Sequence, residues 1–555
     1  MGHIKYIIYE NFIFMYRIIK SKDMRVPKEI RDVERPDHTV IEPYQSGKYA
    51  VRTRVDRYDN KGNLLFRKNQ VIGYVTDSYH PLEKDKALKT VGKIDSKQYG
   101  AVNLLNTLCK GLLTDLCEFY SFPDAEWIYC TALLRASYPG IPDCKLKARY
   151  IHSFVSEFHP GVAMNKDNVT KMLTLLGEQS STIERFMISR LGKVSEEDLI
   201  VIDGCLKQDN GDGLSISRAS RKTAATKVCH HLMMYAYSPL EGEPICSKIY
   251  PGNVTDAVAV KDFVKSLKVH KGLIVADRGF RPEVMRKVSE EYEDLHYLVP
   301  LMKGRLVAER SGCFAFDTVM IRDDGPVSCK RSEAKGKDGE NLGYWLYSFK
   351  SPKIAAEMES EYLERNAGRL DPLLLEAERK WFGVLILQSD RMIEPDFAYD
   401  CYDDRWGIEP LFKLHKSGME VDDTREKSDE SAVGSEFVNY LATIMSARLR
   451  NHLSKFDFCK NRSFKGALSD LRDCVKIKGE DGTWEYRTTA AKDMRFYVRT
   501  GAVTEPDMVS MYGIKSVVQQ EGPRKRGRPV GSKDARPRKR RTVAELTAAR
   551  SDKST

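Results

Sequence analysis

Long apolar runs are missing from this sequence. No stretch reaches the roughly 18 consecutive apolar residues that a membrane-spanning helix needs, because Glu10 and Arg17 interrupt the nearest one, residues 6–19. That stretch also lacks the small-residue cleavage site of a signal peptide. Met24 is a candidate start, which would make 1–23 an upstream extension. These absences exclude a membrane partner and favour a cytoplasmic protein.

Paired cysteines are missing as well. The twelve cysteines form no C-x-x-C pair and have no histidine at zinc-site spacing, so neither a disulfide scaffold nor a zinc module is expected. They are predicted to be the reduced thiols of a cytosolic protein. The adjacent His230 and His231 are interpreted as packing or surface residues, because no further ligand motif accompanies them.

Net positive charge is small outside the C-terminal tail. Residues 522–541 contain ten Lys or Arg and one Asp, a net +9 of the total +11, which leaves +2 for the rest of the chain. This asymmetry predicts a polyanionic partner for the tail. Within it, Arg526-Gly527-Arg528-Pro529 resembles an AT-hook, since arginine is attracted to the narrow minor groove of A·T-rich DNA. The alternative is a non-specific polybasic tail.

Hydrophobic patterning divides the chain into regions. Residues 45–76 alternate around a turn-rich segment, which indicates strands, and 96–195 show helical periodicity. From 196 the pattern predicts the order β-β-β-α-β-α-β, typical of an α/β fold. The predicted regions are a β-rich N-terminal unit at 24–95, an all-helical module at 96–195, an α/β core at 196–300 and 381–455, a β-rich insertion at 301–380, a C-terminal region at 456–500 and a disordered basic tail at 501–555.

Two acidic residues stand where apolar strand patterns end. Asp203 follows "DLIVI" and Asp277 follows "KGLIVA", and Glu409 lies on a later helix. Alone, each strand-end acid is typical of a turn or cap. Three carboxylates brought together repel one another and raise one another's pKa, and divalent cations remove that conflict. Mg²⁺ prefers such oxygens and shares its shell with phosphate oxygens, and two ions can activate the attacking oxygen and stabilise the leaving one.

The segment "YDDRWGIEPLFKLHK" at 402–416 places three more polar side chains around Glu409. On an ideal helix, Arg405 would lie about 40° to one side of Glu409, and Tyr402 and Lys416 about 20° to the other. Pro410 disfavours continuous helix at this point, so a kink or break is expected at 406–410, with Pro410 opening a new helical segment. The alternative is a solvated charged face, with Asp400, Asp403 and Asp404 as competing acids.

The order of elements and the three acids resemble the ribonuclease H-like fold and the Asp-Asp-Glu triad of DDE transposases. Tyr402, Arg405, Glu409 and Lys416 match the Y-x₂-R-x₃-E-x₆-K signature of one bacterial insertion-sequence group, family four and its relatives. "DRGF" at 277–280 and "PGNVTD" at 251–256 resemble further motifs of that group, as does the long β-rich insertion before the third acid.

This resemblance implies a role for each matching residue. Asp203, Asp277 and Glu409 would be catalytic and would hold two divalent ions, Mg²⁺ or alternatively Mn²⁺. Tyr402, Arg405 and Lys416 would contact DNA phosphates, since arginine offers a planar fork and lysine a point charge. Arg526 and Arg528 would contact DNA from the tail.

The implied enzyme is a metal-dependent transposase that hydrolyses and transesterifies phosphodiester bonds. It would cleave terminal inverted repeats, join them to target DNA, act as a homodimer on DNA ends and be associated with the nucleoid in the cytoplasm. The helical module at 96–195 is the candidate for recognising the ends, on position alone. Two alternatives are a catalytically inactive, transposase-derived DNA-binding protein and a ribonuclease H-like nuclease that cuts without strand transfer.

Overall fold

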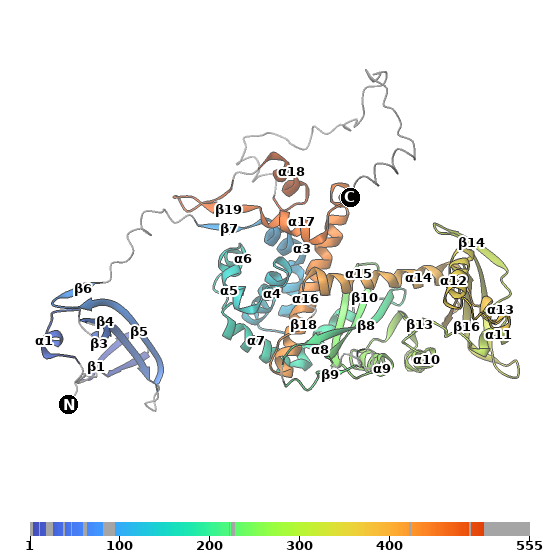
Figure 1. Ribbon diagram of the computed structural model, residues 1–555, viewed down its shortest axis with the longest axis horizontal. Coiled ribbons are helices and arrows are strands. Elements are labelled where there is room, and N and C mark those ends of the chain that lie inside the picture. The colour runs from blue at the N-terminus through green and yellow to red at the C-terminus, as the bar shows by residue number, and fades with distance from the viewer. Residues whose placement is uncertain are drawn as a thin grey trace, which may run out of the picture. The chain divides into compact units, whose positions relative to one another are not determined.

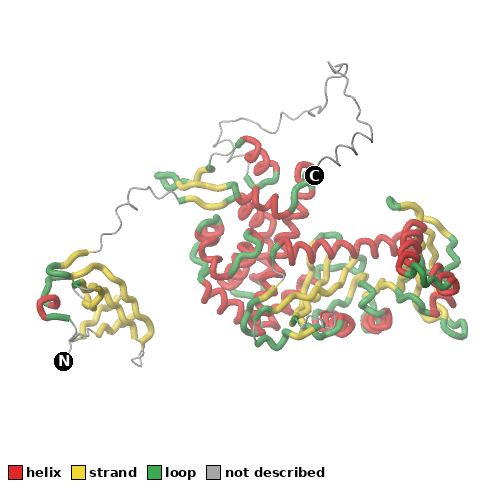
Figure 2. The backbone as a smooth tube through the Cα atoms, viewed as in Figure 1, coloured by secondary structure: helices red, strands yellow, loops and turns green. Residues whose placement is uncertain are grey.

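The computed structural model describes residues 26–36, 39–45, 47–58, 64–81, 95–211, 213–220, 223, 228–420, 423–487 and 490–503, together with the backbone of strands at 4–9 and 12–17. The chain forms two compact units, Met1–Ile94 and Asp95–Thr555 (Figures 1 and 2). The basic tail, with Arg526 and Arg528, lies outside the described residues.

The first unit is built on an antiparallel sheet in the order β3-β4-β5-β6. Its small core contains Val26, Ile41, Val51 and Val75, and strands occur where the alternating pattern predicts them. The elements are β1 (Ile4–Tyr9), β2 (Phe12–Arg17), α1 (Lys28–Arg31), β3 (Thr39–Gln45), β4 (Lys48–Tyr58), β5 (Leu64–Val75) and β6 (Tyr79–Pro81).

The second unit begins with a short strand and a group of helices. Two of these helices have side-chain N-caps, Ser121 accepting from the amide of Asp124 and Asn165 from the amide of Asn168, which satisfies donors that a helix leaves free at its start. The elements are β7 (Ser96–Gln98), α3 (Gly100–Cys117), α4 (Phe122–Ser137), α5 (Asp143–Ile151), α6 (Val155–Phe158), α7 (Lys166–Glu178) and α8 (Ser180–Leu191).

Helix α16 (Asp429–Ser454) joins these helices to the sheet. It is buried on nearly every side, and it belongs to one hydrophobic core that includes residues of α3, α4 and α7 as well as of the sheet. Its backbone approaches α7 closely, because a β-carbon at Gly434 would overlap the carbonyl oxygen of Leu173, and one at Gly177 the carbonyl oxygen of Glu430. The helical region therefore shares its core with the α/β region.

The centre of the second unit is a mixed sheet in the order β11-β10-β8-β12-β13-β17-β16-β15-β14. Strands β8, β12 and β13 are parallel, and β10 and β11 continue the sheet antiparallel. Helices α9 and α10 lie on one face, and α14 and α15 on the other (Figure 1). The first elements are β8 (Leu199–Asp209), β9 (Arg218–Ala219), β10 (Cys229–Ser238), β11 (Glu243–Pro251), α9 (Asp256–Ser266), β12 (Lys271–Ala276), α10 (Pro282–Ser289) and β13 (Asp294–Pro300).

The β-rich insertion extends this same sheet. Strand β17 pairs with β13 on one side and with β16 on the other, both antiparallel. The insertion and the strand that follows it contain α11 (Leu306–Arg310), β14 (Thr318–Arg322), β15 (Gly325–Lys335), β16 (Asn341–Lys350), α12 (Pro352–Arg365), α13 (Pro372–Arg379) and β17 (Val384–Ser389).

The chain then crosses the sheet and ends beside the first helices. Strand β19 pairs with β7 and β20, which connects the C-terminal region to the start of the unit. These elements are α14 (Pro395–Asp404), η2 (Arg405–Gly407), α15 (Ile408–Lys413), η3 (Leu414–Gly418), β18 (Asp423–Thr424), α16, η4 (Asp457–Cys459), α17 (Phe464–Arg472), β19 (Val475–Lys478), β20 (Trp484–Tyr486) and α18 (Ala491–Arg499).

None of the helices in the described part of the chain combines the length and the apolar character needed to cross a bilayer.

Candidate active site

Asp203 and Asp277 lie on neighbouring parallel strands. Ala276, the last residue of β12, pairs with Ile202 of β8, so that Asp277 follows directly beside Asp203. Asp277 stands at the end of its strand, as the sequence predicts. Asp203 does not, because β8 continues to Asp209. The sequence did not predict this continuation, because charged residues usually mark the end of a buried strand. Lys207 and Asp209 are nevertheless part of β8, and each is buried against a charged partner.

The surroundings of Asp203 disfavour the ionised form of its carboxyl group. The pKa of its carboxyl is raised to about 6, mainly by burial and also by the neighbouring Asp277 and Asp256 carboxylates, while the backbone amide of Gly204 and the charge of Arg405 oppose the rise. The amide of Gly204 donates to Asp203 Oδ1 at 2.7 Å. A cation beside Asp203 would therefore be favourable, because the ionised carboxylate lacks full compensation.

The helical segment 395–418 changes its hydrogen-bond pattern at the point expected from Pro410. Helix α14 ends at Asp404, a 3₁₀ turn occupies Arg405–Gly407, and α15 starts at Ile408 with Pro410 in its first turn. A proline is tolerated there because its missing N–H has no intrahelical acceptor. The sequence predicted a kink or break at 406–410. The structure has a 3₁₀ turn at Arg405–Gly407 and a new helix from Ile408, and the residues at these junctions keep right-handed helical φ and ψ, so the hydrogen-bond pattern changes without a break in the helical backbone.

Arg405 reaches Asp277, and Tyr402 lies beside Arg405. The Arg405 side chain is buried, and its Nη1 lies 3.9 Å from Asp277 Oδ1. Its guanidinium stands 5.1 Å from the ring centre of Tyr402 and 4.5 Å from that of Trp406, distances at which cation–π attraction operates. Arg405 Nε is buried without a hydrogen-bond partner among the described residues.

Lys416 and Glu409 differ in their surroundings. Lys416 lies in η3, a π-helical turn, close to Cys205 of β8: burial raises the pKa of this thiol, and a hydrogen bond and the charge from Lys416 oppose the rise. Glu409 is the second residue of α15 and is exposed. Among the described residues it has no partner in a hydrogen bond or ion pair, so its side chain is free to turn.

The residues fit a divalent ion only in part in this conformation. Asp203 and Asp277 supply two hard oxygen ligands of the kind that Mg²⁺ prefers. However, no three His, Cys, Asp or Glu side chains in the described part of the chain are close enough to hold one ion. Glu409 would complete such a set by movement of its own side chain or of α15.

Asp256 is a site residue that the sequence reasoning did not select. It begins α9 on the opposite face of the sheet, where a β-carbon at Gly204 would lie 3.4 Å from Asp256 Oδ1 and one at Gly279 would lie 3.2 Å from Asp256 Oδ2. Its carboxylate thus lies against Gly204 and Gly279, which neighbour Asp203 and Asp277 in the chain. The sequence could have indicated Asp256, because this residue ends the "PGNVTD" motif.

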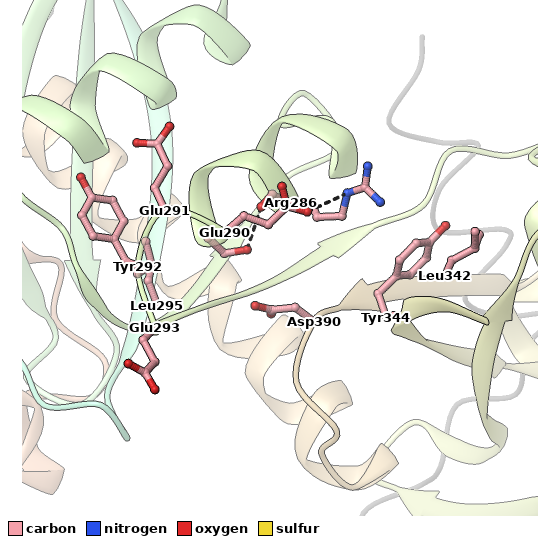
Figure 3. Close-up of a pocket in the computed structure, with 11 residues that line it drawn as sticks. Arg286, Glu290, Glu291, Tyr292, Glu293, Leu295, Leu342, Tyr344 and Asp390 are labelled. Atoms are coloured by element: carbon pink, nitrogen blue, oxygen red, sulfur yellow. Dashed lines mark hydrogen bonds and ion pairs between the residues drawn. The ribbon is translucent and has the colours of Figure 1, made fainter. Parts of the chain in front are cut away.

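A cavity in the second unit lies away from these residues. This cavity of about 550 Å³ is lined by Arg286, Tyr344, Asp390 and several glutamates around Tyr292 (Figure 3). These residues lie at the start of β13, whereas Asp277 follows the end of β12, which runs parallel to β13. None of the candidate residues Asp203, Asp277 and Glu409 lines this cavity.

Of three comparisons with known proteins, the one with family models gives an informative match. Residues 212–437 match the family model of the transposase DDE domain. This segment is less than half of the chain; it includes Asp277, Arg405 and Glu409 and begins beyond Asp203. A comparison with curated proteins gave no match.

Among solved structures, the piggyBac transposase synaptic complex with hairpin DNA is similar at 11% sequence identity. The similarity covers 69% of this chain and 82% of that one, with a TM-score of 0.35. A score at this level does not by itself establish a common fold.

Proposed function

We propose that this protein is a DDE transposase, with Asp203, Asp277 and Glu409 as its catalytic acids. The observation that carries the proposal is the pair of carboxylates on adjacent parallel strands, with the buried Arg405 beside them. The transposase-domain match over 212–437 supports it. The order β8, β10, β11, α9, β12, α10, β13 also supports it, because apart from the two-residue strand β9 it is that of a ribonuclease H-like core.

In this proposal, each group has a defined task. Asp203, Asp277 and, after a rearrangement, Glu409 would hold two divalent ions, Mg²⁺ or Mn²⁺, and these would supply activation of the attacking oxygen and stabilisation of the leaving one. Arg405, which lies beside Asp277, contacts a DNA phosphate near the cut end. Tyr402 and Lys416 contact phosphates next to the bond that is cut. The substrates are the terminal inverted repeats of an insertion sequence and its target DNA, bound by a homodimer, with the helical region recognising the ends.

The test uses DNA ends identified as matching inverted repeats that flank the gene. Purified protein and its Asp277→Asn variant are incubated with end DNA in Mg²⁺ or in EDTA, and cleavage and joined products are followed on sequencing gels. Metal-dependent cutting at the repeat boundary, lost in the variant, is expected. Cutting without any joined product would instead indicate a nuclease without strand transfer.

The exposed, uncontacted Glu409 favours one second candidate, a DNA-binding protein without catalysis. In such a protein, Asp203, Asp277 and Glu409 would not come together around a metal ion. Specific binding of the end DNA with no cleavage in Mg²⁺ or Mn²⁺ would identify that function and contradict the proposal.

Replacing Arg405 with lysine is expected to lower DNA cleavage on the order of 10²-fold, since a point charge cannot reproduce the planar contacts with Tyr402 and Trp406 and small misplacements of catalytic groups have effects of this size. The cleavage rate at saturating DNA measures it. Arg391→Lys is the control, because Arg391 pairs with the exposed Glu197 at 3.5 Å and should tolerate the change. Equal rates for both variants would remove Arg405 from the site.

Deleting residues 522–555 is expected to weaken binding to DNA and to flatten its dependence on salt. Each phosphate contact that is lost reduces the slope of log K against log salt by about 0.9. The control deletion, 542–555, leaves the ten basic residues of 522–541 in place. An unchanged slope after the longer deletion would show that the tail does not contact DNA.

A further inference from the structure

A cluster of buried polar side chains continues from the candidate site into the protein. Lys207 and Asp209 follow Asp203 on the same face of β8, and His231 and Tyr235 face them from β10, where Lys207 pairs with His231 and Asp203 with Tyr235. His415 of η3 and Glu436 of α16 cover them. We call these side chains the buried polar core: Lys207, Asp209, His231, Tyr235, His415 and Glu436.

The buried polar core is closed from solvent and internally paired. Lys207 Nζ lies 2.5 Å from Glu436 Oε1, and both side chains are 2% exposed. His231 Nδ1 lies 2.5 Å from Asp209 Oδ1, with both side chains fully buried. Burial and the charge of Lys207 lower the pKa of His415, and the Lys207 charge, with the two histidines, holds that of Glu436 low in spite of burial.

Five polar atoms of the cluster have no hydrogen-bond partner among the described residues: Asp209 Oδ2, His231 Nε2, Tyr235 Oη, His415 Nε2 and Glu436 Oε2. Buried polar atoms without partners lower stability. A buried ion pair is also weak evidence for stability, because well-packed apolar side chains of the same volume often replace it without loss. The cluster is therefore a poor device for stability alone.

Its position indicates another role. His415 Nδ1 lies 2.9 Å from the Thr443 hydroxyl of α16, and the His415 ring stands edge-on to Tyr235 at 5.7 Å. These contacts fix η3, a π-helical turn of a kind often found at functional sites. The next residue is Lys416, and α15 with Glu409 immediately precedes the turn.

We propose that the buried polar core is a positioning element, which fixes η3 and thereby sets where Glu409 and Lys416 stand relative to Asp203. Its residues do not touch the substrate; they act through the segment 405–418. The effect on catalysis rests on the proposed transposase function. The effect on the position of the segment 405–418 does not.

The test replaces the central ion pair by apolar side chains of similar volume, in the double variant Lys207→Met with Glu436→Leu. Hydrogen–deuterium exchange of peptides covering 405–418 is compared with thermal unfolding, end-DNA affinity and cleavage. We expect a midpoint of unfolding within a few degrees of the wild type, faster exchange at 405–418 and cleavage lowered about tenfold or more, with a smaller loss of DNA affinity because Lys416 is also displaced. Unchanged exchange in this segment would overturn the inference, whatever the cleavage rate.

Two further variants keep the test independent of that pair. His415→Leu removes the group that meets Thr443, and His415→Asn retains a polar atom near the position of Nδ1. Faster exchange at 405–418 in the first, restored in the second, is expected; wild-type exchange in both would contradict the inference. Arg135→Met is the matched control, because Arg135 is a buried cation that donates to Ser435 and Asn439 of the same helix. It should lower the unfolding midpoint without a selective change at 405–418.

The outcomes separate the two proposals. Faster exchange at 405–418 in a protein whose wild type cuts no end DNA would support the positioning of the segment and contradict the proposed function. Faster exchange together with wild-type cleavage would overturn the catalytic consequence.

Discussion

Glu409→Gln is expected to abolish cleavage of end DNA, with a loss on the order of 10³-fold, equivalent to about 4 kcal/mol of transition-state stabilisation. Glutamine keeps the size of the side chain and removes the charge that a divalent ion requires. Because Glu409 is exposed, the variant should fold and bind DNA as the wild type does. Single-turnover cleavage in Mg²⁺, measured alongside DNA affinity, checks this.

The controls for Glu409 are the nearby acids. Burial raises the pKa of Asp404, and the charges of Asp403 and Asp400 raise it further, so Asp404 is the strongest competitor for the role of third ligand. Asp403→Asn and Asp404→Asn should retain cleavage within a few-fold. Loss of activity in Asp404→Asn with full activity in Glu409→Gln would transfer the role to Asp404.

Gly434→Ala should be among the most destabilising single changes in the chain, by about 3 kcal/mol. The added methyl group would overlap the backbone carbonyl of Leu173, and backbone atoms cannot move aside as a side chain can. Chemical denaturation of the full chain measures the effect.

Gly111→Ala is the matched control for Gly434. Gly111 is also helical, in α3, but a β-carbon there would meet nothing within 4 Å. Alanine should therefore raise stability by about 0.5–1 kcal/mol, because glycine loses more backbone entropy on folding. Equal effects at the two positions would show that α7 and α16 do not meet through their backbones.

Much of the α/β region could be predicted from local pattern. The strands β10, β11, β12 and β13 and the helix α9 occur in the predicted order, because their apolar runs are short and are bounded by turn residues. The interruption before Pro410 was also predictable, since the missing N–H and the ring clash of proline are local effects.

Other features depend on partners that are distant in the sequence. The continuation of β8 past Asp203 was missed because Lys207 and Asp209 resemble loop residues until Glu436 and His231 are placed beside them. Helical periodicity at 96–195 could not show that these helices share a core with α16, which lies more than 200 residues later. In the same way, the sequence around Glu409 does not determine how near its carboxylate comes to Asp203.

The pairing of β17 with β13 has a consequence for solubility. An unpaired strand edge offers free N–H and C=O groups to other chains and promotes aggregation. By adding β17, β16, β15 and β14 beyond β13, the insertion moves that edge to β14, where Ile321 is 78% exposed but Arg322 stands beside it and pairs with Asp400 at 2.9 Å. Removing the insertion together with β17 would return the edge to β13, whose core residues Leu298 and Val299 are fully buried. The insertion and β17 thus cover the edge of the central sheet that β13 would otherwise expose.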